Sequence, residues 1–458
     1  MVRLFNVYYP VRTLILILGE TLIVCASFLA ATFIRLGRES VLVLEFENGI
    51  YKVLLITVVA LLCFYYFDLY DSQRVPSAGE TFFRLFVVLG LLSFALAALG
   101  YLFPGFLVGG DVFLLGISIL TISLIAWRWA YYWLLAQPFL RERVYVMGTG
   151  ERAQRLVHAL RTRQDLGMEV VGWAGAVGNG SMTREQLSSQ LVALKEKKAV
   201  DHVIVALKDG RGKMPVRTLL ELRMAGIKVD NATALLERIY GKIEVLGLQP
   251  SWLIFSDGFR VSTHKIVVKR TVSLALSLMA LTISMPIMIL IGIAIRLDSK
   301  GPILFRQERV GKNGKVFKLN KFRSMHVGSD TPGNHPPAQE NDHRFTRVGR
   351  WLRKVHLDEL PQLYNILRGD MYFVGPRPFV PSQEAEYVEK IPYYNLRWVV
   401  KPGATGWAQI KRGYCATIEE NAEKLEYDLY YIKNMSIGLD LMIIFHTLKA
   451  VILGRGGR

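Results

Sequence analysis

Residues 271–295 read TVSLALSLMALTISMPIMILIGIAI, an apolar run without a single charged side chain. A membrane crossing needs roughly 17–25 mainly apolar residues, so this segment is long enough to span a bilayer. Pro286 lies inside the run, where a proline removes a helix hydrogen bond and bends the axis. Cations flank both ends, with Lys269 and Arg270 before and Arg296 after, which is unfavourable for a simple crossing. We therefore expect a re-entrant helix at about 271–295 that enters and leaves on one face, with a straight fifth span as the alternative.

Four further apolar runs precede this segment, at 11–34, 50–67, 82–103 and 112–135. Each is long enough to cross a bilayer, and aromatic residues at several of their ends resemble the belt found at membrane interfaces. The connections between the runs are short. We therefore expect residues 1–137 to form a four-helix transmembrane bundle.

Composition supports an integral membrane protein with basic soluble parts. The chain has 458 residues, of which 52% are hydrophobic, and its formal net charge is +18. These values exclude a disordered chain, a disulfide-stapled mini-protein and a collagen-like fibre. Most of the excess charge lies in residues 260–458, which contain 30 Lys and Arg but 17 Asp and Glu. Such a surface suits membrane lipids with anionic headgroups and anionic substrates. No recognition motif indicates nucleic acid, so we expect no nucleic-acid partner.

The middle region, 138–258, alternates short apolar runs with helix-like segments, which is typical of a doubly wound parallel sheet. We expect a central Rossmann-like α/β domain here. Gly148-x-Gly150-x-x-Ala153 follows a strand and opens a helix, a context that suits a phosphate at a helix N-terminus. The acidic residue expected after the second strand is missing, because Glu169 comes before that strand. We expect a tight glycine turn without a redox cofactor. A membrane-bound nucleotide-sugar oxidoreductase or dehydratase that uses this turn stays open as an alternative.

The last region, 259–458, carries a carboxylate pair, Asp358-Glu359, among several cations: Arg347, Arg350, Arg353, Lys354 and Arg377. Nearby cations favour the ionised form of a carboxylate. An ionised carboxylate can attack phosphorus and form a covalent acyl-phosphate intermediate. Its neighbour can hold Mg²⁺, which prefers oxygen ligands and shares them with substrate phosphates. Taken alone, the pair also fits a solvated helix start.

The same region resembles a known family, the bacterial polyprenyl-phosphate glycosyl-1-phosphate transferases, which are also called monotopic phosphoglycosyl transferases. The resemblance rests on segments that follow one another in order: GPILFRQERVG (301–311), KFRSM (321–325), TRVGR (346–350), LDELPQL (357–363), GDM (369–371), VGPRP (374–378), KPGATGWAQ (401–409) and YDLYYI (427–432). The preceding architecture also looks like the large, exopolysaccharide-type members. Ala404 stands where many relatives carry an aliphatic β-branched residue.

The resemblance implies a C-terminal α/β catalytic domain with a re-entrant membrane helix. It also assigns roles to individual residues: Asp358 as nucleophile, Glu359 as Mg²⁺ ligand, and Lys321, Arg323 and Arg377 as phosphate contacts. Asp428 is a further candidate for the substrate pocket. Arginine suits such contacts because its planar fork matches phosphate oxygens.

The reaction implied by the family has two steps. A nucleoside diphosphate sugar, expected to be a UDP-sugar, transfers its sugar phosphate to Asp358 and releases UMP. Polyprenyl phosphate, expected to be undecaprenyl phosphate, then takes the sugar phosphate as the first intermediate of an exopolysaccharide or glycoconjugate. We expect this to occur at the bacterial inner membrane, with the middle and catalytic domains on the cytoplasmic face. A non-enzymatic scaffold of a polysaccharide assembly complex stays open as another function. The sequence does not determine which sugar is transferred. A homodimer is one oligomeric state that it allows.

Overall fold

The computed structural model describes most of the chain: residues 1–70, 78–103, 105, 109–174, 183–197, 199–207, 214–245, 253, 256, 258, 259, 262–329, 342–413, 415 and 417–452. It divides into two compact units. The N-terminal unit comprises Met1–Val2 and Tyr9–Ala232, and the C-terminal unit comprises Arg3–Tyr8 and Thr233–Arg458. Contacts therefore group Arg3–Tyr8, near the start of the chain, with its last region.

The N-terminal unit begins with helices: α1 (Val11–Leu36), α2 (Ser40–Phe46), α3 (Gly49–Tyr66), α4 (Ala78–Leu102) and α5 (Gly110–Ala136). The four long helices match the four predicted apolar runs, and they pack around a common core that includes Val24, Ile56, Leu92 and Leu120. Within the described residues, five helices are long and apolar enough to cross a membrane, namely these four and α11 (Thr263–Asp298). These helices indicate a membrane protein.

One carboxylate lies inside this helical core. Glu20 of α1 is fully buried, and it accepts hydrogen bonds from Arg128 Nε of α5 and from the Tyr70 hydroxyl, each at 2.7 Å. Burying a charge in an apolar environment is costly unless an opposite charge and hydrogen bonds compensate for it. Arg128 supplies that charge to Glu20.

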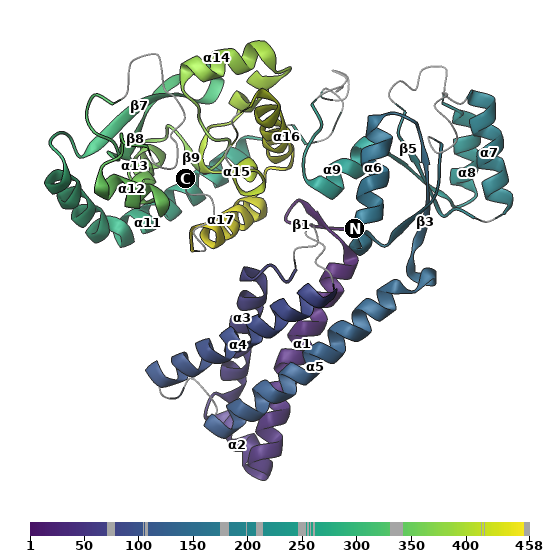
Figure 1. Cartoon of the computed structure of the whole chain (residues 1–458), viewed down its shortest axis with the longest axis horizontal. Helices are drawn as coiled ribbons and strands as arrows, with labels where there is room; N and C mark the ends of the chain where they lie inside the picture. Colours follow the sequence, from purple (N-terminus) through teal and green to yellow (C-terminus); the bar gives the residue numbers. More distant parts are fainter. Residues whose placement is uncertain are drawn as a thin grey trace. The chain divides into compact units, whose positions relative to one another are not determined.

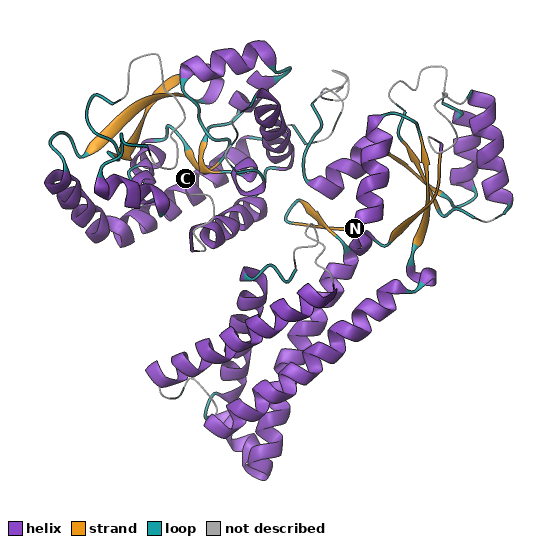
Figure 2. Cartoon of the chain, viewed as in Figure 1, coloured by secondary structure: helices purple, strands orange, loops and turns teal. Residues whose placement is uncertain are grey.

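The rest of the N-terminal unit is an α/β domain with a four-stranded sheet (Figure 2). Its strands are β3 (Glu142–Met147), β4 (Met168–Trp173), β5 (His202–Val205) and β6 (Lys228–Asn231). They lie in the order β4-β3-β5-β6 and are all parallel, as the alternating pattern predicts. The accompanying helices are α6 (Glu151–Thr162), α7 (Arg184–Glu196) and α8 (Val216–Met224).

The glycine turn between β3 and α6 is explained by the fold. Gly148 has φ of 150°, a conformation that side chains disfavour, and a Cβ there would clash with the backbone of Ala206. Its carbonyl accepts a hydrogen bond from Trp173 Nε1 at 2.6 Å. The turn therefore needs glycine for packing, whether or not a ligand binds.

The C-terminal unit mixes helices with two small sheets (Figure 1). An antiparallel hairpin is formed by β7 (Leu304–Val310) and β8 (Val316–Phe322), and a parallel pair by β9 (Tyr372–Val374) and β10 (Gly403–Thr405). The helices are α9 (Ala232–Tyr240), α11, α12 (Arg347–Lys354), α13 (Gln362–Arg368), α14 (Pro381–Lys390), α15 (Trp407–Lys411), α16 (Ile418–Asn434) and α17 (Ile437–Ile452). Short 3-10 helices in the described part of this unit are η5 (Lys312–Gly314), η6 (Leu357–Glu359) and η7 (Tyr394–Val399).

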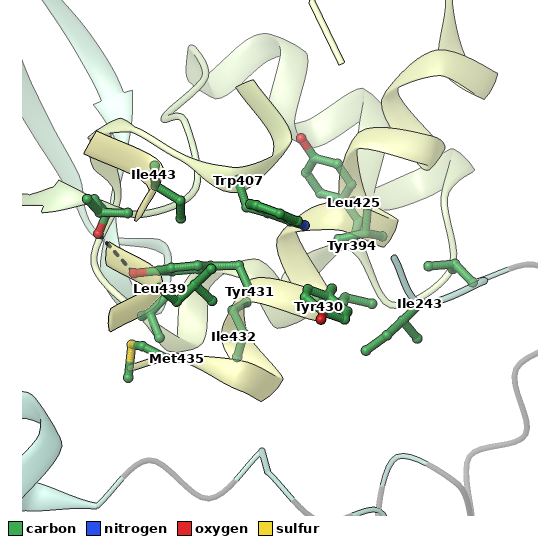
Figure 3. Packing of buried hydrophobic residues seen from close by; sticks show 14 of the residues in the cluster. Ile243, Tyr394, Trp407, Leu425, Tyr430, Tyr431, Ile432, Met435, Leu439 and Ile443 are labelled. Carbon is green, nitrogen blue, oxygen red and sulfur yellow. Dashed lines mark hydrogen bonds between the residues drawn. The ribbon is translucent and has the colours of Figure 1, made fainter. Parts of the chain in front are cut away.

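The main core of this unit combines aromatic and aliphatic side chains (Figure 3). Trp407 stacks on Tyr430 with ring centroids 5.9 Å apart. The Tyr431 hydroxyl contacts Val374 O at 3.3 Å and Asp440 Oδ1 at 2.7 Å. These contacts connect α16 and α17 to the end of β9, directly before the segment that carries Arg377.

Both halves of the long helix α11 pack against the same α/β body. Near its start, the Arg270 guanidinium donates to the carbonyl oxygens of Ile366 and Leu367 in α13. Near its end, Ile295 packs in a cluster with Phe322 of β8 and Leu352 of α12. Asp298, the last helical residue, accepts a hydrogen bond from the backbone of α12. The helix is 36 residues long, so it would measure about 54 Å if straight.

The first residues of the chain also pack on this unit, through a hairpin of β1 (Val2–Leu4) and β2 (Val7–Tyr9). Arg3 and Asn6 donate to the side chain and backbone of Asn434, each at 2.9 Å. This hairpin was not predicted from the sequence, because its contacts lie more than 400 residues away along the chain.

Candidate active site

Three of the predicted site residues meet at one carboxylate. Lys321 near the end of β8 donates from Nζ to Glu359 Oε1 at 2.7 Å. Arg377, which follows β9, donates from Nη2 to the same oxygen at 2.8 Å. Asp358 precedes Glu359 in η6. Residues from three separate segments thus form one charged cluster, which we call the Glu359 cluster: Lys321, Asp358, Glu359 and Arg377.

The local sequence explains why the carboxylate pair lies in a short 3-10 turn. His356 has φ of 57°, a left-handed conformation that ends the preceding helix α12. Leu357 and Leu360 pack into apolar clusters on either side of the pair. Pro361 then stands directly before α13, where a missing backbone N–H costs little. The two leucines thereby anchor the turn and place Asp358 where only 7% of it is exposed.

The two carboxylates have opposite pKa shifts. Burial raises the pKa of Asp358, and the neighbouring charge of Glu359 adds to this, while Lys321 opposes it. Burial would also raise the pKa of Glu359, but the combined charges and hydrogen bonds of Arg377 and Lys321 outweigh it and hold that pKa well below its usual range. The Glu359 charge is therefore fixed by its partners, while Asp358 accepts no hydrogen bond from them. An acidic pair with separated pKa values is typical of two groups with different tasks.

A second buried network holds Arg377 in place through its backbone. Its backbone oxygen accepts a hydrogen bond from Arg397 Nη2 at 2.8 Å. Arg397 in turn pairs with Asp428 at 2.9 Å and with Glu384 at 3.3 Å. The structure therefore places Asp428 behind the Arg377 segment, where it orients Arg397, and not among the residues that contact Glu359. Burial raises the pKa of Asp428, and Arg397 opposes that shift.

Arg323 lies apart from the Glu359 cluster. Its Nη1 and Nη2 atoms donate to the carbonyl oxygens of Lys300 and Ser299, each at 2.7 Å, directly after α11. A cation at this position satisfies carbonyl groups beyond the helix end and complements the helix dipole. The contacts made by Arg323 thus fix the turn that follows the membrane-type helix, and its role as a phosphate contact stays a prediction.

The carboxylates can be tested against the ligand preferences of Mg²⁺. Among the described residues, no three His, Cys, Asp or Glu side chains gather as a metal-binding group. Mg²⁺ does not need one, since it commonly takes one or two carboxylates and fills its shell with water and substrate phosphates. Both bonds from the cations go to Oε1 of Glu359, and Asp358 is adjacent. The donor set therefore fits Mg²⁺ bound together with a phosphorylated substrate.

Three residues of this site were missed by the sequence analysis. Asn365 bonds the backbone of Asn320 at 2.9 Å and so fixes the end of β8 beside Lys321. Arg309 and Lys424 lie against the segment that follows Arg377. Arg309 stands within a segment that carries the family resemblance, and Lys424 stands one helical turn before Asp428, so both positions offered a signal.

Comparisons with known proteins address the family. The family model described as "Bacterial sugar transferase" matches residues 264–454. A UDP-glucose:undecaprenyl-phosphate glucose-1-phosphate transferase of Xanthomonas campestris pv. campestris is 30% identical over 98% of this chain and 96% of its own length. The protein of that name from Escherichia coli (strain K12) is 33% identical over 69% of this chain and 68% of its own length.

A third relative matches over a shorter region. This UDP-N-acetylgalactosamine-undecaprenyl-phosphate N-acetylgalactosaminephosphotransferase of Aeromonas hydrophila is 37% identical over 53% of this chain, and the match spans 56% of its own length. The matched family region contains the whole Glu359 cluster. From the full-length similarity and the family match together, the chain belongs to the bacterial polyprenyl-phosphate glycosyl-1-phosphate transferases.

Proposed function

We propose that this protein transfers a sugar 1-phosphate from a UDP-sugar to undecaprenyl phosphate and so initiates an exopolysaccharide or glycoconjugate. The observation that carries the proposal is the Glu359 cluster, in which a buried aspartate stands beside a carboxylate held by two cations. The names of the relatives agree in reaction type and differ in the sugar.

The first step uses Asp358 as the nucleophile. A carboxylate oxygen of Asp358 attacks the phosphorus that bears the sugar, and a bond forms between them. The bond from this phosphorus to the bridging oxygen breaks, and UMP leaves with the electron pair. In the second step an oxygen of undecaprenyl phosphate attacks the same phosphorus, which releases Asp358 and forms the diphosphate bond. Splitting the transfer in this way replaces one difficult encounter by two easier ones.

The surrounding charges have separate tasks in this scheme. Lys321 and Arg377 bind phosphate oxygens and stabilise the negative charge that develops in the transition state. Glu359 is the residue that would hold Mg²⁺, which would supply further charge neutralisation on the phosphates when it is bound. Arg397 keeps the Arg377 segment in position, so that less ordering is needed when substrate binds.

The contacts of α11 support the proposed membrane geometry. Arg270 at its start and Asp298 at its end both contact one α/β body. A straight crossing would separate these ends by about the thickness of a bilayer. We infer that α11 bends at Pro286 and enters only one leaflet, on the cytoplasmic face of the inner membrane. The acceptor phosphate stays at headgroup depth because burying its charge in hydrocarbon is costly. The active site can then meet the acceptor without extracting its lipid tail.

The test is a UMP-release assay of the purified protein with undecaprenyl phosphate, Mg²⁺ and a panel of UDP-sugars. We expect one or a few sugars to give UMP and a lipid-linked product. Asp358→Asn should abolish both, whereas Glu386→Gln, a change on the exposed face of α14, should leave them unchanged. Turnover by Asp358→Asn at the wild-type rate would contradict the proposal.

A further inference from the structure

Lys424 is a buried cation that the two-step scheme does not use. It lies on α16 with 8% of its surface exposed, and its ammonium faces the ring of Phe379 at 5.5 Å. Within the part of the chain that the structure describes, it forms no hydrogen bond and no ion pair. Lysines are rarely buried without a partner, because removing the charge from water is costly. An anionic ligand would compensate for this cost.

Two buried carboxylates in this part of the C-terminal unit are already engaged by another residue. Asp428, four residues further along α16, pairs with Arg397 at 2.9 Å, and Glu384 also pairs with Arg397. Arg397 lies over the same Phe379 ring, at 4.9 Å from its centroid. Both carboxylates therefore pair with Arg397. Neither forms an ion pair with Lys424, so its ammonium is available to a ligand.

Lys424 and Arg309 both lie against the segment that carries Arg377. Phe379 is two residues after Arg377, and Arg309 Nη1 donates to Pro378 O at 3.2 Å. Arg309 Nε is buried without a hydrogen-bond partner in the described part of the chain. Burial lowers the pKa of both groups, to about 10 for Arg309, and the charge of Arg377 adds to both shifts. Nearby carboxylates oppose these shifts without cancelling them, namely Glu359 and Glu384 at Arg309 and Asp428 at Lys424. The segment thus lies beside cations whose charges are only partly compensated.

We propose that Lys424, assisted by Arg309, binds the phosphate of the nucleotide that leaves in the first step. This proposal rests on the proposed function, in which the donor carries two linked phosphates. Lys321 and Arg377 already serve the phosphate that Asp358 attacks. The second phosphate gains negative charge as its bond breaks, so it needs cations of its own. The acceptor's phosphate has similar chemistry and is the competing source, which the experiment separates.

The experiment measures binding of UMP to the full-length protein in detergent, without turnover. Lys424→Met removes the charge at similar volume and should weaken UMP affinity by about tenfold or more, as loss of a charge-assisted hydrogen bond predicts. Lys424→Arg keeps the charge and should retain most of the affinity. Lys390→Met on exposed α14 is the matched control and should bind as wild type does. The unfolding temperature of Lys424→Met without ligand should not fall, since the change removes an unpaired buried charge.

Several outcomes would overturn the proposal. Wild-type UMP affinity in Lys424→Met is one. Equal losses in the methionine and arginine variants are another, because they would indicate shape and not charge. A parallel titration with a short-chain polyprenyl phosphate should show no difference between Lys424→Met and wild type, and a loss confined to that lipid would assign Lys424 to the acceptor. Failure of the proposed function gives a different result, in which the wild-type protein releases no UMP from any UDP-sugar.

Discussion

At the scale of single residues, the central feature is the contrast between two neighbouring carboxylates. Glu359 is fixed as an anion by Lys321 and Arg377, whereas Asp358 is buried without those bonds. This arrangement favours Asp358 as a nucleophile, because a carboxylate whose oxygens accept few hydrogen bonds keeps its lone pairs available for attack. In the proposed mechanism, Asp358 therefore performs the chemistry and Glu359 binds positive charge.

This contrast predicts a pH dependence. Burial raises the pKa of Asp358, and only its ionised form attacks phosphorus, so kcat/KM for UMP release should fall as pH drops through a value above the ordinary aspartate range. Lys321→Met removes a charge that lowers the pKa of Asp358, so the fall in kcat/KM at low pH should move to higher pH. Lys318→Met, on the exposed face of the same strand, should not move it. An unchanged acid limb in Lys321→Met would contradict the coupling.

The sequence predicted the residue types of the site better than their positions. Lys321, Glu359 and Arg377, which the family resemblance assigned to one site, form one charged cluster. The placement of Arg323 at the end of α11 and of Asp428 behind Arg377 depends on tertiary packing, which no local pattern records. Lys424 was missed because one lysine in a charged helix resembles a solvated one until its burial is known.

At the scale of elements, α11 is attached to the rest of its unit by a buried polar contact. Lys269 Nζ donates to Asp440 of α17 and to the Tyr431 hydroxyl, and all three side chains are buried. Such a pair is costly to form but more costly to break, because the remaining charge has no partner.

Asp440→Ala should therefore destabilise the C-terminal unit by about 3–5 kcal/mol, since it leaves the Lys269 ammonium buried and unpaired. The double variant Lys269→Met/Asp440→Leu should recover most of that loss, because it removes both charges. Thermal unfolding of the detergent-solubilised protein measures both effects. A double variant as unstable as Asp440→Ala would show that the charge pair is not the cause.

Pro286 allows a test of the bend that we propose for α11. Replacing it with leucine restores a helix hydrogen bond and should favour a straight crossing, which moves the C-terminal unit across the membrane. A cysteine introduced at exposed Lys390 reports the side through labelling with a membrane-impermeant reagent. We expect Pro286→Leu to change the labelling of this cysteine. The neighbouring control Ile287→Leu should be labelled as the parent protein is. Identical labelling in both would count against the bend.

The elements themselves were largely predictable from the sequence. The long apolar runs became helices α1, α3, α4, α5 and α11, since length and composition alone determine them. The parallel sheet followed from the alternation of strands and helices. The hairpin β1–β2 was not predictable, because two three-residue strands carry almost no periodic signal and are stabilised by distant contacts.

At the scale of the whole molecule, the proposed reaction requires two substrates to use one site in turn. UMP must leave before the lipid phosphate attacks, because both approach the phosphorus carried by Asp358. Initial rates measured over both substrate concentrations should therefore give parallel double-reciprocal lines, the pattern of ping-pong kinetics. Intersecting lines would indicate direct transfer within a ternary complex.

The glycine turn of the N-terminal unit allows a test that separates sugar-phosphate transfer from an oxidoreductase function. Gly148 is required by a positive φ and by close packing against Ala206, so the glycine turn needs no dinucleotide to explain it. We expect the purified protein to contain no bound NAD(H), and added NAD⁺ to leave both the unfolding temperature and UMP release unchanged. Absorbance near that of bound NADH would favour the oxidoreductase alternative.

The most direct test of the proposed mechanism is to trap the enzyme after the first step and to measure the mass of the modified peptide. Incubation of the purified protein with UDP-sugar and Mg²⁺, without acceptor lipid, followed by acid quenching and peptide mass spectrometry, should find one added hexosyl phosphate on the peptide that contains Asp358. Undecaprenyl phosphate added before quenching should remove it. The account predicts this adduct on Asp358 alone. Its absence under conditions that release UMP, or its presence on another residue, would contradict the central claim.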